Sequence, residues 1–306
     1  TDSLNGLEDT FWRAKIEPVQ LSEFQLSDEQ QQDYLRKAIY LLSSFRKGEL
    51  RPSQVFDIEK LAKVMAIRAV LGSSEFDYRD TKFYFNPETS LLEPITKEIH
   101  VDLNLNFKDH YYSWWIDSTK IRPHYANNTN PFINLLYSEI KFYEIYLKEL
   151  NKFSEKNYFQ KIIKQNKIEF EKNLKILKKN YPTRKVFSEK HLMITKTRIQ
   201  DVLNPVQGLD IKFVEYNKNI LKLNVSNLQR LPIEIVGMKF SDGMKLNNKK
   251  RVLIEGKKVF KPAQDVLLEF DCEFKEECKK DQINQQFLTF KILGQNKDKK
   301  AKISEY

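Results

Sequence analysis

The stretch between residues 100 and 124 holds six side chains that can ligate a metal ion. They are His100, His110, His124, Asp102, Asp109 and Asp117. Metal motifs need fixed spacings, such as two histidines four residues apart on one face of a helix. No such pair and no other metal spacing occurs in this stretch. We therefore expect a structural or surface role for the cluster as a whole.

Aromatic residues are concentrated in the segment DHYYSWWID. Adjacent exposed aromatics can stack on sugars or bases, which makes Tyr111, Trp114 and Trp115 candidates for ligand stacking. Aromatic residues also anchor long loops to the core of a domain, and we favour that interpretation for this segment.

Several classes of protein are excluded by composition or by missing motifs. The sequence has no Gly-x-Ser-x-Gly, no phosphate-binding P-loop and no dinucleotide fingerprint. Its 21 Phe and 14 Tyr can form a sizeable core, which argues against full disorder, and 2 Cys are too few for a disulfide scaffold. No run of about 18 apolar residues encodes a membrane span.

The two cysteines, Cys272 and Cys278, are separated by five residues. We expect two free thiols beside the end of a strand. The alternative is a small local disulfide, which implies an oxidising compartment. A zinc site is not expected, because no second Cys or His pair lies nearby.

The net charge of +10 is distributed unevenly. Residues 1–130 hold 16 basic and 20 acidic residues, whereas residues 131–306 hold 36 and 22. This asymmetry suits an acidic partner, such as nucleic acid, an anionic polymer, lipid headgroups or an acidic protein. The alternative, which we favour, is an ordinary lysine-rich surface. Base recognition favours arginine, and most basic residues here are lysines, so nucleic acid is not the expected partner. The lysine run over 164–185 is expected on a helix, either as an ordinary solvated face or as an anionic-polymer contact.

Residues 1–205 are predicted to be mostly helical. Apolar residues with a helical period predict helices over 27–47, 53–72, 135–150, 155–180 and 188–203. Ser27 and Gln30 predict a capping box for the first helix, and Gly72 is expected to end the second. Two short apolar runs, 82–85 and 91–95, flank the turn Asn86-Pro87-Glu88-Thr89 and predict a β-hairpin. Residues 101–131 have no clear period and are expected to form a long, partly ordered insertion.

After Pro205 the pattern changes to alternating apolar and polar residues. Six short segments follow, separated by Asn, Gly, Asp and Lys turns, at 210–216, 219–225, 233–240, 250–256, 265–274 and 286–293. This spacing is typical of a small antiparallel β-sandwich. The chain is therefore predicted to be an α+β protein with two domains, residues 1–205 and 206–306.

Residues 56–100 resemble the CotH family, atypical protein kinases named after a spore-coat protein. The matching features are Asp57, a helix to Leu71 followed by Gly72, and a hairpin from FYFNP at 83–87 to LEPI at 92–95. Helices over 131–203 fit the family's C-terminal helical region, so the resemblance covers residues 27–205. It implies that residues 1–205 form a mostly helical, kinase-like C-lobe with a β-hairpin, followed by a β-sandwich-like module.

The resemblance also implies roles for four residues near the hairpin. Glu75 stands where the family has its catalytic Asp, and Asp80 stands five residues later, where the family has a metal-binding Asn. Glu98 stands at the family's principal metal-binding Asp, and His100 stands where Asp or Asn is frequent. The implied cofactor is Mg or Mn with ATP, because phosphoryl transfer uses hard cations held by oxygen ligands.

All four positions depart from the family's residue types. Glu in place of Asp extends the reach of a carboxylate by about 1 Å, which phosphoryl transfer tolerates badly. The alternative is that these are ordinary acidic residues in a loop and at the end of a hairpin. A kinase N-lobe also needs a glycine-containing phosphate loop, and Gly6 is the only glycine before residue 27. The chain is therefore expected to begin after the N-lobe.

Three functions follow from these observations. The first is a CotH-like kinase module that transfers phosphate from ATP to a protein, degenerate or incomplete as it stands. The second is a non-catalytic pseudokinase or structural cell-surface protein, which binds a protein partner through its β-module. The third is an anionic-polymer-binding protein. The resemblance favours a cell-surface or extracellular location, with a cytoplasmic one as the alternative.

Overall fold

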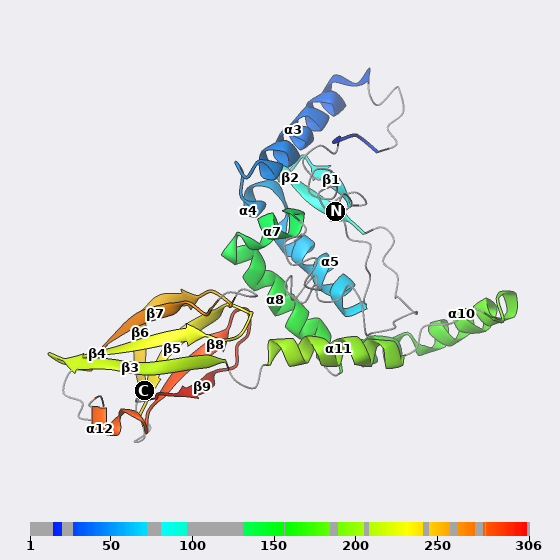
Figure 1. The fold of residues 1–306 in the computed structure, drawn as a ribbon. Helices are drawn as coiled ribbons and strands as arrows, with labels where there is room; N and C mark the ends of the chain where they lie inside the picture. The colour runs from blue at the N-terminus through cyan, green and yellow to red at the C-terminus, as the bar shows by residue number, and fades with distance from the viewer. Residues whose placement is uncertain are drawn as a thin grey trace, which may run out of the picture. The chain divides into compact units, whose positions relative to one another are not determined.

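The computed structural model describes residues 15–19, 27–71, 81–96, 131–155, 157–183, 189–204, 208–240, 245–257, 262–272, 278 and 280–304 (Figure 1). Helices and antiparallel sheets are both present, which confirms the predicted α+β class. The chain divides into two compact units, residues 1–200 and 201–306. The boundary predicted after residue 205 remains a prediction, because residues 205–207 lie outside the described ranges. No helix in these ranges has the length and apolar character needed to span a bilayer.

Helix α3 (Glu29–Arg46) is capped by Asp28. Its carboxylate oxygen Oδ1 accepts a hydrogen bond of 3.0 Å from the backbone N–H of Gln31. The prediction of Ser27 as the cap is therefore wrong by one residue, because Asp28 has the extended backbone that lets its side chain reach this N–H. Gly48 follows the helix with a φ of 74°, a left-handed conformation that glycine adopts without steric cost.

The helix predicted over 53–72 is divided into α4 (Pro52–Val55) and α5 (Ile58–Leu71). Phe56, between them, forms a parallel β-bridge with Leu92 and therefore leaves the helical conformation. Helix α5 packs along α8 (Ile140–Ser154). The predicted apolar stripe of α5 is buried as expected, and it comprises Ile58, Leu61, Ala62, Met65, Ala66, Ala69 and Val70.

The β-hairpin prediction is confirmed by strands β1 (Lys82–Asn86) and β2 (Leu91–Ile95). The remaining helices of this part of the chain are α7 (Pro131–Tyr137), α9 (Tyr158–Gln165), α10 (Lys167–Asn180) and α11 (Glu189–Leu203). The predicted single helix over 155–180 breaks at Asn166, whose side-chain amide donates to the carbonyl of Ile162 at 2.8 Å. The backbone N–H of Asn166 donates to the same carbonyl at 3.1 Å, and the two helices are separated by the non-helical φ of −106° and ψ of 18° at Asn166.

The second unit contains two antiparallel sheets. The first has the order β3-β4-β7, and the second has the order β6-β5-β8-β9. The strands are β3 (Leu209–Asn217), β4 (Ile220–Asn227), β5 (Ile233–Lys239), β6 (Lys245–Ile254), β7 (Asp265–Asp271), β8 (Phe287–Ile292) and β9 (Lys299–Lys302), with the short helix α12 (Lys280–Ile283) before β8. All six predicted strands are present, and β9 is an addition that sequence analysis missed.

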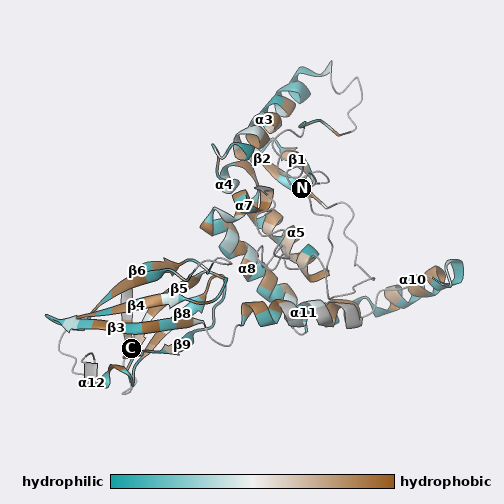
Figure 2. Cartoon of the chain, viewed as in Figure 1, coloured by the Kyte–Doolittle hydropathy of each residue, from teal (hydrophilic) through white to brown (hydrophobic). Residues whose placement is uncertain are grey.

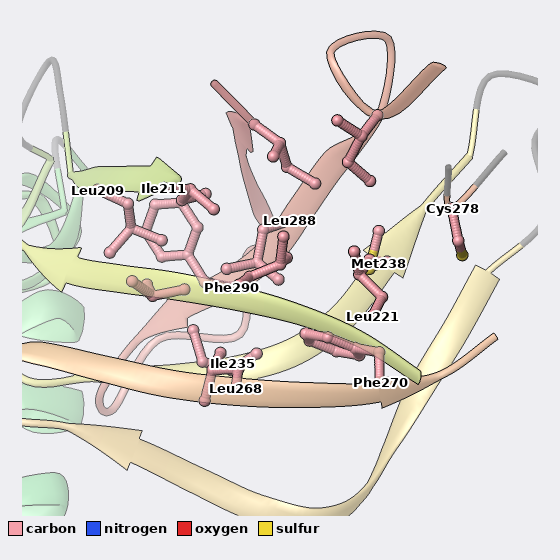
Figure 3. Packing of buried hydrophobic residues seen from close by; sticks show 14 of the residues in the cluster. Leu209, Ile211, Leu221, Ile235, Met238, Leu268, Phe270, Cys278, Leu288 and Phe290 are labelled. Carbon is pink, nitrogen blue, oxygen red and sulfur yellow. The ribbon is translucent and has the colours of Figure 1, made fainter. Parts of the chain in front are cut away.

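One hydrophobic core is shared by both sheets. Figure 3 shows side chains of the first sheet, such as Leu221 and Phe270, beside side chains of the second, such as Met238 and Phe290. Alternating burial along β8 and along the start of β3 places every second side chain in this core.

A disulfide joins Cys272, after the end of β7, to Cys278. The prediction of two free thiols is therefore wrong. Both cysteines are fully buried in the shared core, and the backbone N–H of Cys272 donates to the carbonyl of Asn219 at 2.7 Å. The chain after β7 is thus tied both to the β3–β4 turn and to the segment that leads into α12.

The double variant Cys272→Ala/Cys278→Ala should lower the free energy of unfolding of this unit by about 2 kcal/mol, because a short closed loop restricts the unfolded chain. Urea denaturation of the full chain under non-reducing conditions measures the change. Dithiothreitol should destabilise the parent chain to a similar extent and leave the variant unchanged. Two reactive thiols in the denatured, unreduced parent chain would contradict the assignment.

Candidate functional site

The register of the β1–β2 hairpin fixes which parts of the chain meet at its open end. Lys82 pairs with Ile95, and Asn86 pairs with Leu91 at the turn. The side-chain oxygen of Asn86 accepts a hydrogen bond from the N–H of Glu88 at 2.9 Å, and Ser90 has a φ of 55°. The turn that connects β1 to β2 is therefore stabilised by its own residues. The chain therefore enters β1 and leaves β2 at one end of the hairpin. The segments 72–80 and 97–100 are both joined to this end.

The start of helix α5 is bonded directly to strand β2. The N–H of Asp57 donates to the carbonyl of Leu92 at 3.0 Å, next to the bridge between Phe56 and Leu92. The carboxylate of Asp57 also caps α5, because Oδ1 accepts from the N–H of Lys60 at 3.0 Å. One residue thus begins the helix and holds the hairpin against it.

A polar network extends this joint across the hairpin. The ammonium of Lys60 lies 2.7 Å from Oε2 of Glu93 and 3.3 Å from Oδ2 of Asp57. The other carboxylate oxygen of Glu93 accepts from the amide of Asn86 at 2.8 Å. The Asn86 hydrogen bond, followed by that of Lys60, holds the pKa of Glu93 below its ordinary value of 4.5. Glu93 in turn raises the pKa of Lys60.

Aromatic rings support the inner face of the hairpin. The ring of Phe56 is 5.0 Å from Phe83 of β1 and 4.9 Å from Phe45 of α3, the latter edge to face. Phe132 of α7 packs on the same group, and Tyr34 of α3 packs on Phe85. Edge-to-face packing adds to the burial of these rings, so α3, α7 and the hairpin share one aromatic cluster.

A buried cation lies near the other end of α5. Arg68 is only 4% exposed and stands in the last turn of the helix, where a positive charge is favoured by the helix dipole. Its position continues the buried face of Leu61 and Met65 at helical spacing, and that spacing is a signal that sequence analysis left unused. Arg68 therefore places positive charge three residues before the end of α5, where segment 72–80 begins.

The residues that carry the predicted chemistry lie outside the described ranges. They are Glu75, Asp80, Glu98, His100, Tyr111, Trp114 and Trp115. Among the residues that the structure does describe, no group of three His, Cys, Asp or Glu side chains is arranged to hold a metal ion. What the structure supplies is the frame for the catalytic and metal-ligand candidates: α5, the joint at Asp57 and the register of the hairpin. Sequence analysis missed the bonds that Lys60, Glu93 and Asn86 make within this frame.

No family model, curated protein or solved structure matches this chain. The frame around the hairpin is therefore interpreted from its own geometry and from the sequence.

The carboxylate of Glu93 should contribute to stability in a pH-dependent way. Its pKa is lowered in the folded chain, so its contribution is complete above 4.5 and is lost as the pH falls through the lowered value. The free energy of unfolding should therefore fall less between neutral and acidic pH in Glu93→Gln than in the parent chain. Urea denaturation at a series of pH values measures this slope.

Glu59→Gln is the matched control, since Glu59 is an exposed carboxylate in the first turn of α5. This variant should retain the slope of the parent chain. Equal slopes for Glu93→Gln and the parent would show that the bonds to Lys60 and Asn86 do not stabilise the fold.

Proposed function

We propose that residues 27–205 are the C-lobe of a CotH-like atypical kinase, with its phosphoryl-transfer residues on the two segments that adjoin the hairpin. The observation that carries this proposal is the pairing of Lys82 with Ile95. It joins the segment with Glu75 and Asp80 and the segment with Glu98 and His100 to one end of a hairpin that is fixed to α5. The order of helix, segment, hairpin and segment is the order that the resemblance implies.

The residue types of the two segments suit the proposed chemistry. Glu75 has the role of the carboxylate that accepts the proton of the substrate hydroxyl. Asp80 and Glu98 supply carboxylate oxygens and His100 supplies an imidazole nitrogen, and two carboxylates are a suitable donor set for Mg or Mn. When bound, the metal neutralises charge on the phosphates of ATP. The buried Arg68 adds positive charge near the start of the first segment, which favours anionic groups there.

The proposal predicts different effects for the metal ligand and the base. Glu98→Gln should abolish binding of Mn and of Mn with ATP, because it removes a charged ligand. Glu75→Gln should retain this binding and, once an ATP-binding N-lobe is supplied, lower phosphate transfer to a protein acceptor at least about a hundredfold, the usual contribution of a general base. Isothermal titration measures binding, and transfer of labelled phosphate measures activity.

Glu88→Gln is the matched control, since Glu88 is an exposed carboxylate at the closed end of the hairpin. It should match the parent chain in both measurements. Absence of metal binding by the parent chain, with the fold intact by circular dichroism, would reject the kinase proposal.

A second candidate is a non-catalytic protein that binds a protein partner through the β-module. The observation that favours it is the position of β7 at the edge of its sheet, where β4 is its only paired neighbour among the described strands. Leu267 on β7 is 53% exposed. An edge strand with an exposed apolar residue suits the addition of a partner strand. Phosphate transfer that depends on Glu75 would reject the view that the chain is non-catalytic.

The same module supports a proposal for location. Both cysteines of the chain are used in the disulfide. Disulfides form and persist in oxidising compartments, so we propose that the protein functions at the cell surface or outside the cell.

A further inference from the structure

Helices α9 and α10 expose apolar side chains along their length. Neither helix contains a buried residue within the part of the chain that the structure describes. The exposed apolar residues include Ile168 at 87%, Tyr181 at 55% and Phe170 at 38%. In Figure 2 hydrophobic and hydrophilic residues alternate along α10. Helix α9 is tied to α8 by the ring of Tyr158, which packs on Phe153 at 5.0 Å.

Four apolar residues of α10 and its C-cap are placed on one line, whereas Ile168 and Ile176 lie on other sides of the helix. Phe170, Leu174, Leu177 and Tyr181 follow each other at intervals of four, three and four residues. At about 100° per residue these positions fall within one narrow face of the helix. We call these four residues the apolar seam. Leu174 and Leu177 are half-buried and the other two are exposed.

Lysines are distributed unevenly around the axis of α10. Residues 158–181 hold seven lysines and two glutamates. By helical angle, Lys167 and Lys178 lie together on one side of the seam, beside Glu171, with which Lys167 forms an exposed ion pair at 3.8 Å. Lys172, Lys175 and Lys179 lie on the face opposite the seam. The segment therefore combines an apolar line with neighbouring positive charge and a positively charged back.

These features distinguish between the possible occupants of the surface. A second copy of the chain would bring two segments of the same net positive charge together, which is unfavourable. An anionic polymer would neutralise the lysines but would leave the apolar seam in water. A bilayer with anionic headgroups suits both the apolar seam and the lysines, because apolar side chains enter the interface of the bilayer while lysines contact the headgroups.

We propose that α9 and α10 form a surface that binds anionic lipid membranes, with the apolar seam inserted and Lys167 and Lys178 at the headgroups. This function is independent of phosphoryl transfer. The segment lies in the same compact unit as the hairpin, residues 1–200, so membrane binding would hold that unit at the bilayer.

The test uses the full chain and vesicles that contain phosphatidylglycerol and phosphatidylcholine, measured by co-sedimentation. The parent chain should bind these vesicles, and vesicles of phosphatidylcholine alone should bind it much more weakly. Phe170→Ser and Leu174→Ser should each weaken binding at least about tenfold, because each removes a large apolar side chain from the interface. Tyr40→Ser and Leu267→Ser remove exposed apolar residues elsewhere and should leave binding unchanged.

Two pairs of lysine variants test the orientation of the helix. Lys167→Gln/Lys178→Gln should weaken vesicle binding about twenty-fivefold, since each lysine at an anionic surface contributes about fivefold. Lys172→Gln/Lys175→Gln makes the same change of charge on the back of α10 and should have a clearly smaller effect. Circular dichroism should be unchanged in all these variants, because none of the substituted residues of α10 is buried.

Three results would overturn the proposal. The first is failure of the parent chain to bind the mixed vesicles. The second is binding, to heparin or to vesicles, that falls equally in both pairs of lysine variants and is unchanged in Phe170→Ser. That result would identify a contact of charge alone, as with an anionic polymer. The third is a dimer in sedimentation equilibrium that Phe170→Ser and Leu174→Ser dissociate while vesicle binding persists, which identifies the apolar seam as a contact between copies.

Discussion

The bond between the N–H of Asp57 and the carbonyl of Leu92 is the constraint on which the helical unit depends. It joins the residue that precedes α5 to the second residue of β2, and the ring of Phe56 is fully buried beside it. A backbone bond in this position fixes one strand against one helix with a single register, because a shift by one residue would turn the side chains of β2 to the opposite face. Leu92 would then lose its place in the core, where it is 1% exposed. The position of the open end of the hairpin follows from this joint.

The hairpin itself depends on the helices around it. Two antiparallel strands are marginal in water on their own. Strands β1 and β2 are stable here because Phe83 and Phe85 pack on rings of other elements and because Lys60 connects Glu93 to the start of α5. The cost of fixing five residues in each strand is therefore met by contacts across the unit. The two segments that adjoin the open end are attached to a rigid support whichever chemistry they perform.

The sequence was sufficient for features that depend on local periodicity, and insufficient for features that depend on distant partners. The stripe of α5, the hairpin turn and six strands follow from spacing and turn residues alone. The break at Phe56 does not, because its cause is Leu92, thirty-six residues away in the chain. Strand β9 is Lys-Lys-Ala-Lys and has almost no apolar pattern, so it depends on partners that are distant in the sequence, namely β8 and, just after the strand, β3. The disulfide likewise follows from the packing that brings Cys278 back to the end of β7.

In the candidate site, too, some features follow from the sequence and others depend on distant partners. The resemblance was sufficient to name Glu75, Asp80, Glu98 and His100, and the register of the hairpin then relates the segments that carry them. Lys60, Glu93 and Asn86 could not be recognised as a network, because their contacts require β2 to lie against α5. Arg68 was recognisable in principle, since it stands on the apolar face of a helix, where an arginine is rarely found without a role.

The proposed chemistry and the proposed membrane surface depend on different physical properties of the chain. Phosphoryl transfer needs groups held to a fraction of an ångström, which suits segments attached to a hairpin with a single register. Binding to a lipid interface needs only an apolar line and nearby positive charge, which α10 provides without burying any residue. Because neither α9 nor α10 contains a buried residue among those that the structure describes, substitutions on α10 should leave the support of the hairpin intact.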